Sequence, residues 1–156
     1  MDPLSQFPTD THHNPQYLDL PINLWESMKS YVANLGNEEA CGLIAGMWDS
    51  SVYMAEFIIP VTNYLHSSVR YQMDPQEQLE ALLNIEMSGK DLVAIYHSHP
   101  LGPALPSPTD IEETYYPESI QIIWFRQDSD WSCRGFIVRQ GEVQEVIIRL
   151  TNRNSD

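Results

Sequence analysis

Leu92-Val93-Ala94-Ile95-Tyr96-His97-Ser98-His99 is a continuous apolar run that leads directly into two histidines. An uninterrupted apolar run of this kind is typical of a central strand that is buried on both faces. Side chains two residues apart in a strand point to the same side, so His97 and His99 are expected to project together while Ser98 faces away. Two imidazoles on one face form a natural half of a zinc site.

The chain after this strand offers a carboxylate that would complete such a site. Residues 100–108 contain four prolines and one glycine, and Asp110 follows them. Prolines lower the entropy cost of ordering a loop, which makes Asp110 a candidate third ligand with water in the fourth position. Ser107-Pro108-Thr109-Asp110 is equally a capping box at the start of a helix, and taken alone this second interpretation is the stronger one. We expect the metal-ligand and the capping interpretations to hold together only if the Asp110 side chain turns toward the histidines instead of back to the N-cap residue of its helix.

Apolar periodicity on either side of this segment predicts an α/β domain of the α+β type, in which helices flank a mixed, mostly antiparallel sheet. Helices are expected from Pro21 to Gly36, from Asp74 to Gly89 with Leu79, Leu82, Leu83 and Met87 on an apolar face, and from Thr109 to about Tyr115. Strands are expected at residues 41–47, 51–59, 92–96, 120–125, 133–138 and 143–150. Residues 1–16 are proline-containing and polar, and include His12 and His13, so we expect a flexible tail before a single domain at 17–156.

Composition and charge restrict the classes of partner and compartment. The 22 acidic residues outnumber 8 Lys and Arg, and the net charge of −14 opposes binding to nucleic acid or to an anionic membrane. No apolar stretch approaches the roughly 18 residues that span a bilayer, and the N-terminus lacks the pattern of a signal peptide. Cys41 and Cys133 form neither a disulfide framework nor a four-sulfur zinc site, so a reducing cytoplasm is expected.

The segment as a whole resembles the signature of the JAMM/MPN zinc metalloprotease family, which is His-Ser/Thr-His, seven residues, Ser, two residues and Asp. Here His97-Ser98-His99, Ser107 and Asp110 have this spacing. Upstream, Glu39-Ala40-Cys41-Gly42-Leu43 is similar to a Glu-Ala-Cys-Gly-Leu element of the family, and Asn63 with residues 70–75 resembles its small stand-alone prokaryotic members. The resemblance extends over about residues 20–150, and only residues 111–119 stand where eukaryotic relatives carry a long second insertion.

The resemblance implies a zinc-dependent isopeptidase or peptidase with one catalytic ion. In this alignment His97, His99 and Asp110 would bind the zinc. Glu39 would act as general base and acid, and Ser107 would donate a hydrogen bond to the developing oxyanion. The implied partner is a ubiquitin-like or sulfur-carrier protein with a C-terminal Gly-Gly tail, and cleavage would follow that tail.

Three questions stay open at the level of the sequence. The chain could instead be a catalytically inactive MPN scaffold that only binds partners, although scaffold members typically lose one or more ligands and none is missing here. If the chain is an enzyme, it could deconjugate a modified protein, process a precursor, or release an amino acid from a sulfur carrier. Homodimer formation is also left open.

Overall fold

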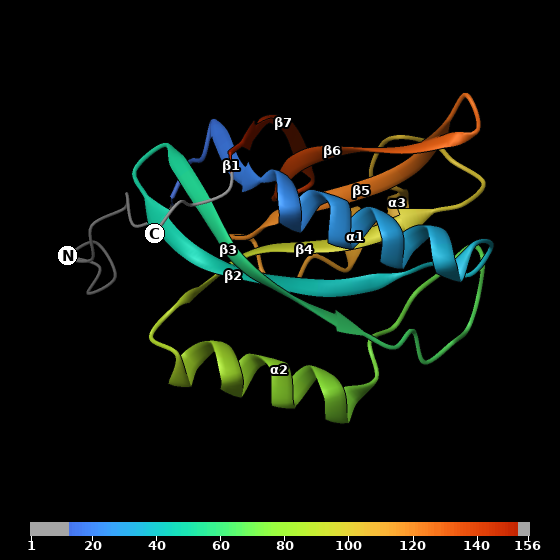
Figure 1. The fold of residues 1–156 in the computed structure, drawn as a ribbon, viewed down its shortest axis with the longest axis horizontal. Coiled ribbons are helices and arrows are strands. Elements are labelled where there is room, and N and C mark those ends of the chain that lie inside the picture. Colours follow the sequence, from blue (N-terminus) through green and yellow to red (C-terminus); the bar gives the residue numbers. More distant parts are fainter. Residues whose placement is uncertain (1–12, 153–156) are drawn as a thin grey trace, which may run out of the picture.

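The computed structural model describes residues 13–152, in which the strands close into a ring and the helices pack on it (Figure 1). The strands are β1 (Tyr17–Pro21), β2 (Cys41–Asp49), β3 (Val52–Val61), β4 (Asp91–His99), β5 (Ile120–Gln127), β6 (Asp130–Arg139) and β7 (Glu142–Thr151). The helices are α1 (Ile22–Leu35), α2 (Pro75–Met87) and α3 (Pro108–Glu112). The expected α+β architecture with a mixed sheet is confirmed.

The strands follow the order β1-β3-β2-β4-β5-β6-β7 around a closed barrel. Antiparallel pairing joins β2 to β3 and β4, and β6 to β5 and β7. Parallel pairing joins β1 to β3 and β7, and β4 to β5. The sequence did not predict β1, and this short strand closes the ring because it pairs on both sides.

Both faces of the central strands are buried because a helix covers each of them, as Figure 1 shows for α1 and α2. On the α1 side, Ile44 of β2 packs in one apolar cluster with Met28 and Val32. On the α2 side, Leu43 and Ala45 belong to a second cluster. Adjacent residues of one strand thus serve two cores, which explains an apolar run in place of an apolar–polar alternation.

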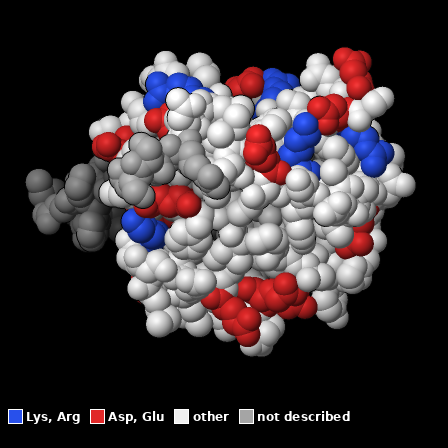
Figure 2. Space-filling view, in the orientation of Figure 1, with Lys and Arg blue, Asp and Glu red and all other residues white. Residues whose placement is uncertain are grey.

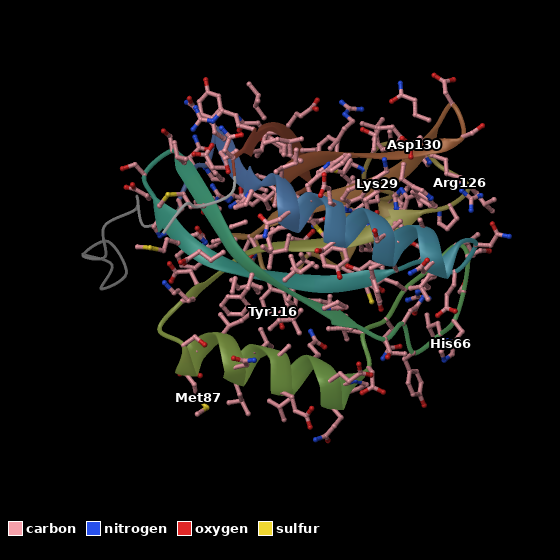
Figure 3. The ribbon with its side chains drawn as sticks, viewed as in Figure 1. Lys29, His66, Met87, Tyr116, Arg126 and Asp130 are labelled. Carbon is pink, nitrogen blue, oxygen red and sulfur yellow. The ribbon has the colours of Figure 1, made fainter. Side chains whose placement is uncertain are left out.

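The apolar face predicted for α2 is wrong for most of its members. Leu79, Leu83 and Met87 are 55%, 47% and 87% exposed, and Met87 points away from the sheet in Figure 3. The residues that α2 buries are Ala81 and Ile85.

The orientation of α2 follows from its first turn. Asp74 caps the helix as expected, because its side chain accepts a hydrogen bond from the backbone of Glu77. The Glu77 carboxylate accepts from both the backbone nitrogen and the hydroxyl of Thr62, at 3.2 and 3.1 Å. Residues four apart share a helix face, so this anchor directs Glu77, Ala81 and Ile85 toward the body of the protein.

Residues 1–12, which hold most of the expected tail and His12, lie outside the described residues, so the flexibility of this tail stays a prediction. The ring of His13 lies 4.7 Å from that of Trp48. The backbone nitrogen of Gln16 donates to the carbonyl of Ser51 at 2.7 Å. Packing against the domain therefore begins before residue 17.

On the face shown in Figure 2, acidic side chains gather over α2, and no Lys or Arg side chain of the described residues lies beside them there. Several cations are already paired with acids, as in Lys29–Asp130 at 2.9 Å and Arg134–Glu145 at 2.6 Å. Between residues 13 and 152, every helix is too short or too polar to cross a membrane.

Candidate metal centre

The two histidines lie at the C-terminal end of β4, which pairs with β2 on one side and with β5 on the other. β4 continues through His99, and His97 lies opposite Cys41 of β2 and Ile123 of β5. The side chains of His97 and His99 converge on one side of the strand, with their Nε2 atoms 3.0 Å apart. The alternation of side chains along a strand thus produces the expected pair of imidazoles.

Asp110 reaches the same point from α3. Its Oδ2 lies 3.1 Å from Nε2 of His97 and 3.2 Å from Nε2 of His99. Three donor atoms are therefore mutually 3.0–3.2 Å apart. Ligands of a tetrahedral zinc ion, with bonds of 2.0–2.2 Å, are separated by roughly 3.3 Å, so the spacing fits a metal ion held between them.

The expectation that Asp110 must choose between its cap and the histidines is wrong. The backbone nitrogen of Ser107 donates to Oδ2 of Asp110 at 2.8 Å, and the Ser107 hydroxyl accepts from the backbone nitrogen of Asp110 at 3.0 Å. The capping box is complete while the same Oδ2 faces both imidazoles. A carboxylate oxygen has more than one lone pair, so it can accept the backbone hydrogen bond and still face a metal.

A turn after β4 fixes the orientation of His99. Gly102 has a φ of +73°, which glycine adopts readily, and its backbone nitrogen donates to the carbonyl of His99 at 2.9 Å. The next residue presents its carbonyl to the ring, and Nδ1 of His99 donates to the oxygen of Pro103 at 2.8 Å. A proton on Nδ1 leaves the lone pair of Nε2 pointing at the centre, which is how protein-bound metals are usually held by histidine.

Glu39 enters the site from the residues just before β2, although it lies about sixty residues upstream of the histidines. Since Cys41 is opposite His97 in an antiparallel pair, the residue two before Cys41 comes level with His99. Ser98, on the far side of β4, secures this position, because its hydroxyl accepts from the backbone nitrogen of Ala40 at 2.7 Å. Glu39 is 3% exposed, and one of its carboxylate oxygens lies within 4.8 Å of a ring nitrogen of each histidine.

The two carboxylates of the site have opposite pKa shifts. Burial, with a smaller contribution from the charge of Asp110, raises the pKa of Glu39 to about 7, against a partial opposing effect of His99. Burial acts in the same direction on Asp110, but the contacts with His97 and His99 outweigh it and hold the pKa of Asp110 below its usual range. In the metal-free site the surroundings thus favour the ionised form of Asp110 and disfavour that of Glu39, a division typical of hydrolytic sites.

The site opens into a cleft with a volume of about 520 Å³. Glu39, His99, Ser107 and Asp110 line its floor, and residues 68–73 and 113–116 contribute to its walls. Val69, Leu101 and Tyr115 also line the cleft, although more than two thirds of each side chain is exposed. Such an apolar rim around a polar floor is typical of a binding site for a polypeptide or a small molecule.

The structure brings all five residues singled out in the sequence into this centre, and it adds two that reasoning on the sequence did not assign to the site. The ring of Tyr71 stacks on His97 at 4.6 Å, and the carbonyl of Pro103 orients His99. The local pattern of apolar residues could not predict the stack of Tyr71 on His97, because the stack joins an irregular segment to a strand that follows much later in the chain.

The chain is similar to known proteins over most of its length. Residues 24–139 match the family described as prokaryotic homologs of the JAB domain. A probable TtuB-protein conjugate cleaving protease of Thermus thermophilus is 35% identical over 133 residues, which are 84% of this chain and 82% of that protein. A CysO-cysteine peptidase of Mycobacterium tuberculosis is 33% identical over 137 residues, 87% of this chain and 92% of that protein.

A solved structure supports the same assignment. The solution structure of a protein from Desulfitobacterium hafniense has a TM-score of 0.79 and 28% identity, and the match covers 88% of this chain and 95% of that one. The family match spans more than half of the chain, and the two relatives cover most of it. This protein therefore belongs to the family of prokaryotic homologues of the JAB domain.

Proposed function

We propose that this protein is a zinc-dependent peptidase or isopeptidase that cleaves the amide bond after the C-terminal glycine tail of a ubiquitin-like or sulfur-carrier protein. The observation that carries the proposal is geometric: Nε2 of His97, Nε2 of His99 and Oδ2 of Asp110 lie 3.0–3.2 Å from one another. The buried carboxylate of Glu39 stands within 4.8 Å of a ring nitrogen of each histidine. Two relatives that cover most of the chain carry names that refer to cleavage of a protein conjugate and of a CysO-cysteine bond, which supports this substrate class.

His97, His99 and Asp110 would hold the ion through two nitrogens and one oxygen, a ligand set that suits zinc and excludes metals that require thiolates. When bound there, zinc supplies Lewis acidity to a water and to the scissile carbonyl, with a water pKa of about 7 in favourable sites. The hydrogen bonds to Pro103 and Ser107 hold one imidazole and the carboxylate in place for this task.

Glu39 would take the proton from the attacking water and then deliver it to the leaving amine. Both steps require a carboxylate that can take up and release a proton, and burial favours the protonated form of Glu39 by raising its pKa. Ser107 lines the cleft and uses its oxygen as an acceptor in the capping box, so its hydroxyl proton is free to donate to the developing oxyanion. Helix capping and catalysis then use different parts of one hydroxyl group.

An extended tail of small residues would fit the cleft, and glycines would let the chain approach the floor closely. The partner, in this proposal, ends in Gly-Gly and contacts the apolar rim with the residues that precede those glycines. A metal-free scaffold would not need a buried, proton-exchanging carboxylate beside two histidines and a second carboxylate, which is why hydrolysis is favoured. We place the protein in a reducing cytoplasm, in keeping with Cys41 and Cys133, which are free thiols.

The test is cleavage of a ubiquitin-like protein whose Gly-Gly tail is joined through an amide to a reporter. Mass spectrometry of the products is expected to place the cut after the second glycine. The Glu39→Gln variant should keep its zinc and lose about 10²–10⁴-fold in rate. Glu38→Gln is the matched control, because Glu38 pairs with His66 on the surface, and it should cleave at the wild-type rate. Equal rates for wild type and Glu39→Gln would rule out the proposed role.

A further inference from the structure

The two histidines of the centre are supported in different ways. His99 is fixed through Nδ1, which donates to the carbonyl of Pro103. Among residues 13–152, the hydrogen bonds of the His97 side chain all use Nε2, which faces His99 and Asp110. A metal-binding histidine normally has its second nitrogen held by a carboxylate or a carbonyl, and without that bond its ring needs another constraint.

Tyr71 provides a contact that can fix the ring of His97. The two ring centroids are 4.6 Å apart and the planes differ by 25°, so the rings are stacked. The centroid of the His99 ring lies 4.8 Å from that of His97, with the planes at 64°, and this ring limits rotation on its own side. Tyr71 itself packs against the apolar cluster that includes Cys41 and Leu43 of β2. The imidazole of His97 is thus held by a ring that the core supports.

Asn63 fixes the segment that carries Tyr71. This side chain is 1% exposed, and its amide nitrogen donates to the carbonyl of Arg70 at 3.1 Å. Its amide oxygen accepts from the backbone nitrogen of Gln72 at 3.1 Å. One buried amide therefore holds the residues on both sides of Tyr71. The same amide nitrogen donates to the backbone carbonyl of Glu39 at 3.1 Å, so the segment and the backbone of Glu39 share one anchor.

We propose that Tyr71, held in place by Asn63, is a positioning residue that sets the orientation in which His97 binds the metal. The proposal rests on the metal centre proposed above and adds a residue that acts on a metal ligand without binding the metal itself. The aromatic ring carries this role, because stacking on an imidazole needs a flat face and leaves the hydroxyl unused. Tyr71→Phe should therefore preserve it, whereas a side chain without a flat ring should not.

The experiment compares Tyr71→Phe, Tyr71→Met and the control Tyr115→Met, since Tyr115 lines the cleft but is 77% exposed. Zinc affinity is measured by competition with a chromophoric chelator, and the Co²⁺-loaded proteins are compared by visible absorption, which reports the ligand geometry. Tyr71→Met is expected to bind zinc about 10–100-fold more weakly, the usual cost of losing a group that orients a metal ligand. Its Co²⁺ spectrum should change, while Tyr71→Phe and Tyr115→Met should match the wild type.

Unfolding of the metal-free variants separates positioning from a merely structural role. A folded Tyr71→Met chain with wild-type zinc affinity and an unchanged Co²⁺ spectrum would overturn the proposal. A Tyr71→Met chain that fails to fold, while Tyr71→Phe folds and binds, would also overturn it, because the ring would then serve the core and not His97. A wild-type protein that binds no zinc would instead refute the proposed function itself, so the two failures are distinguishable.

Discussion

Replacing Glu39 by glutamine is expected to stabilise the metal-free protein above neutral pH, although it removes catalysis. The carboxylate is buried in the folded chain, where its pKa rises from the ordinary 4.5 to about 7. The full shift corresponds to about 3 kcal/mol of unfavourable free energy for the ionised form. Water in the adjoining cleft lowers this penalty, so we expect a gain of about 1–2 kcal/mol for the variant.

The pH dependence of this gain has a definite sign. Between pH 4.5 and pH 7, the folded wild type keeps a proton on Glu39 that the unfolded chain has already released. The free energy of unfolding of the wild type therefore falls as pH rises through this window. Glutamine does not titrate, so the advantage of Glu39→Gln should grow from pH 5 to about pH 7 and then level off.

Urea denaturation of the two chelator-treated proteins, measured from pH 5 to pH 9, tests this reasoning. With zinc restored, the same variant should lose about 10²–10⁴-fold in cleavage rate. A stabilising substitution that abolishes activity is the mark of a group kept at a cost in stability for its chemistry. The reasoning is refuted if Glu39→Gln is less stable than the wild type, or if the difference does not change with pH.

Four further outcomes are expected. Ser107→Ala should lower kcat by about 10²–10³-fold through the lost oxyanion donor, and urea unfolding should show about 1 kcal/mol lost with the helix cap; wild-type kcat would contradict this. Asp110→Asn keeps an acceptor for the backbone of Ser107 but loses its charge, so α3 should persist by hydrogen exchange while zinc affinity in the chelator competition falls. Gly46→Ala should cost about 3 kcal/mol or more in thermal unfolding, because a methyl group there would overlap the carbonyl of Met54 and overpacking of backbone is poorly tolerated. A chelator should abolish cleavage by the wild type reversibly, with activity returning on addition of zinc.

The convergence of His97 and His99 could be predicted from the sequence because local rules govern it. The apolar run predicted the strand, and the two-residue period of side chains along a strand placed His97 and His99 on the same side. The assignment of Glu39 needed a family resemblance, since its place beside His99 depends on the pairing of β2 with β4. Its elevated pKa likewise depends on burial, a property of the folded chain.

Other features could not be predicted from the sequence, for physical reasons. The alternation of β1, with Leu18 and Leu20 buried, is only five residues long and merges into the helix that follows it. The face that α2 buries holds Ala81 and Ile85, and it follows from contacts with β2 and β3 and from the hydrogen bonds between Glu77 and Thr62, which the pattern within the helix does not reveal. The stack of Tyr71 on His97 joins segments that come together only in the folded protein.

Stoichiometric zinc titration of the chelator-treated protein, followed by cleavage of a Gly-Gly conjugate, tests the account most directly. Activity should rise in proportion to added zinc and saturate at one equivalent per chain, and His97→Ala should show no such rise at these concentrations. Full cleavage by the metal-free protein, or no cleavage of any Gly-Gly conjugate by the zinc-loaded wild type, would contradict the account.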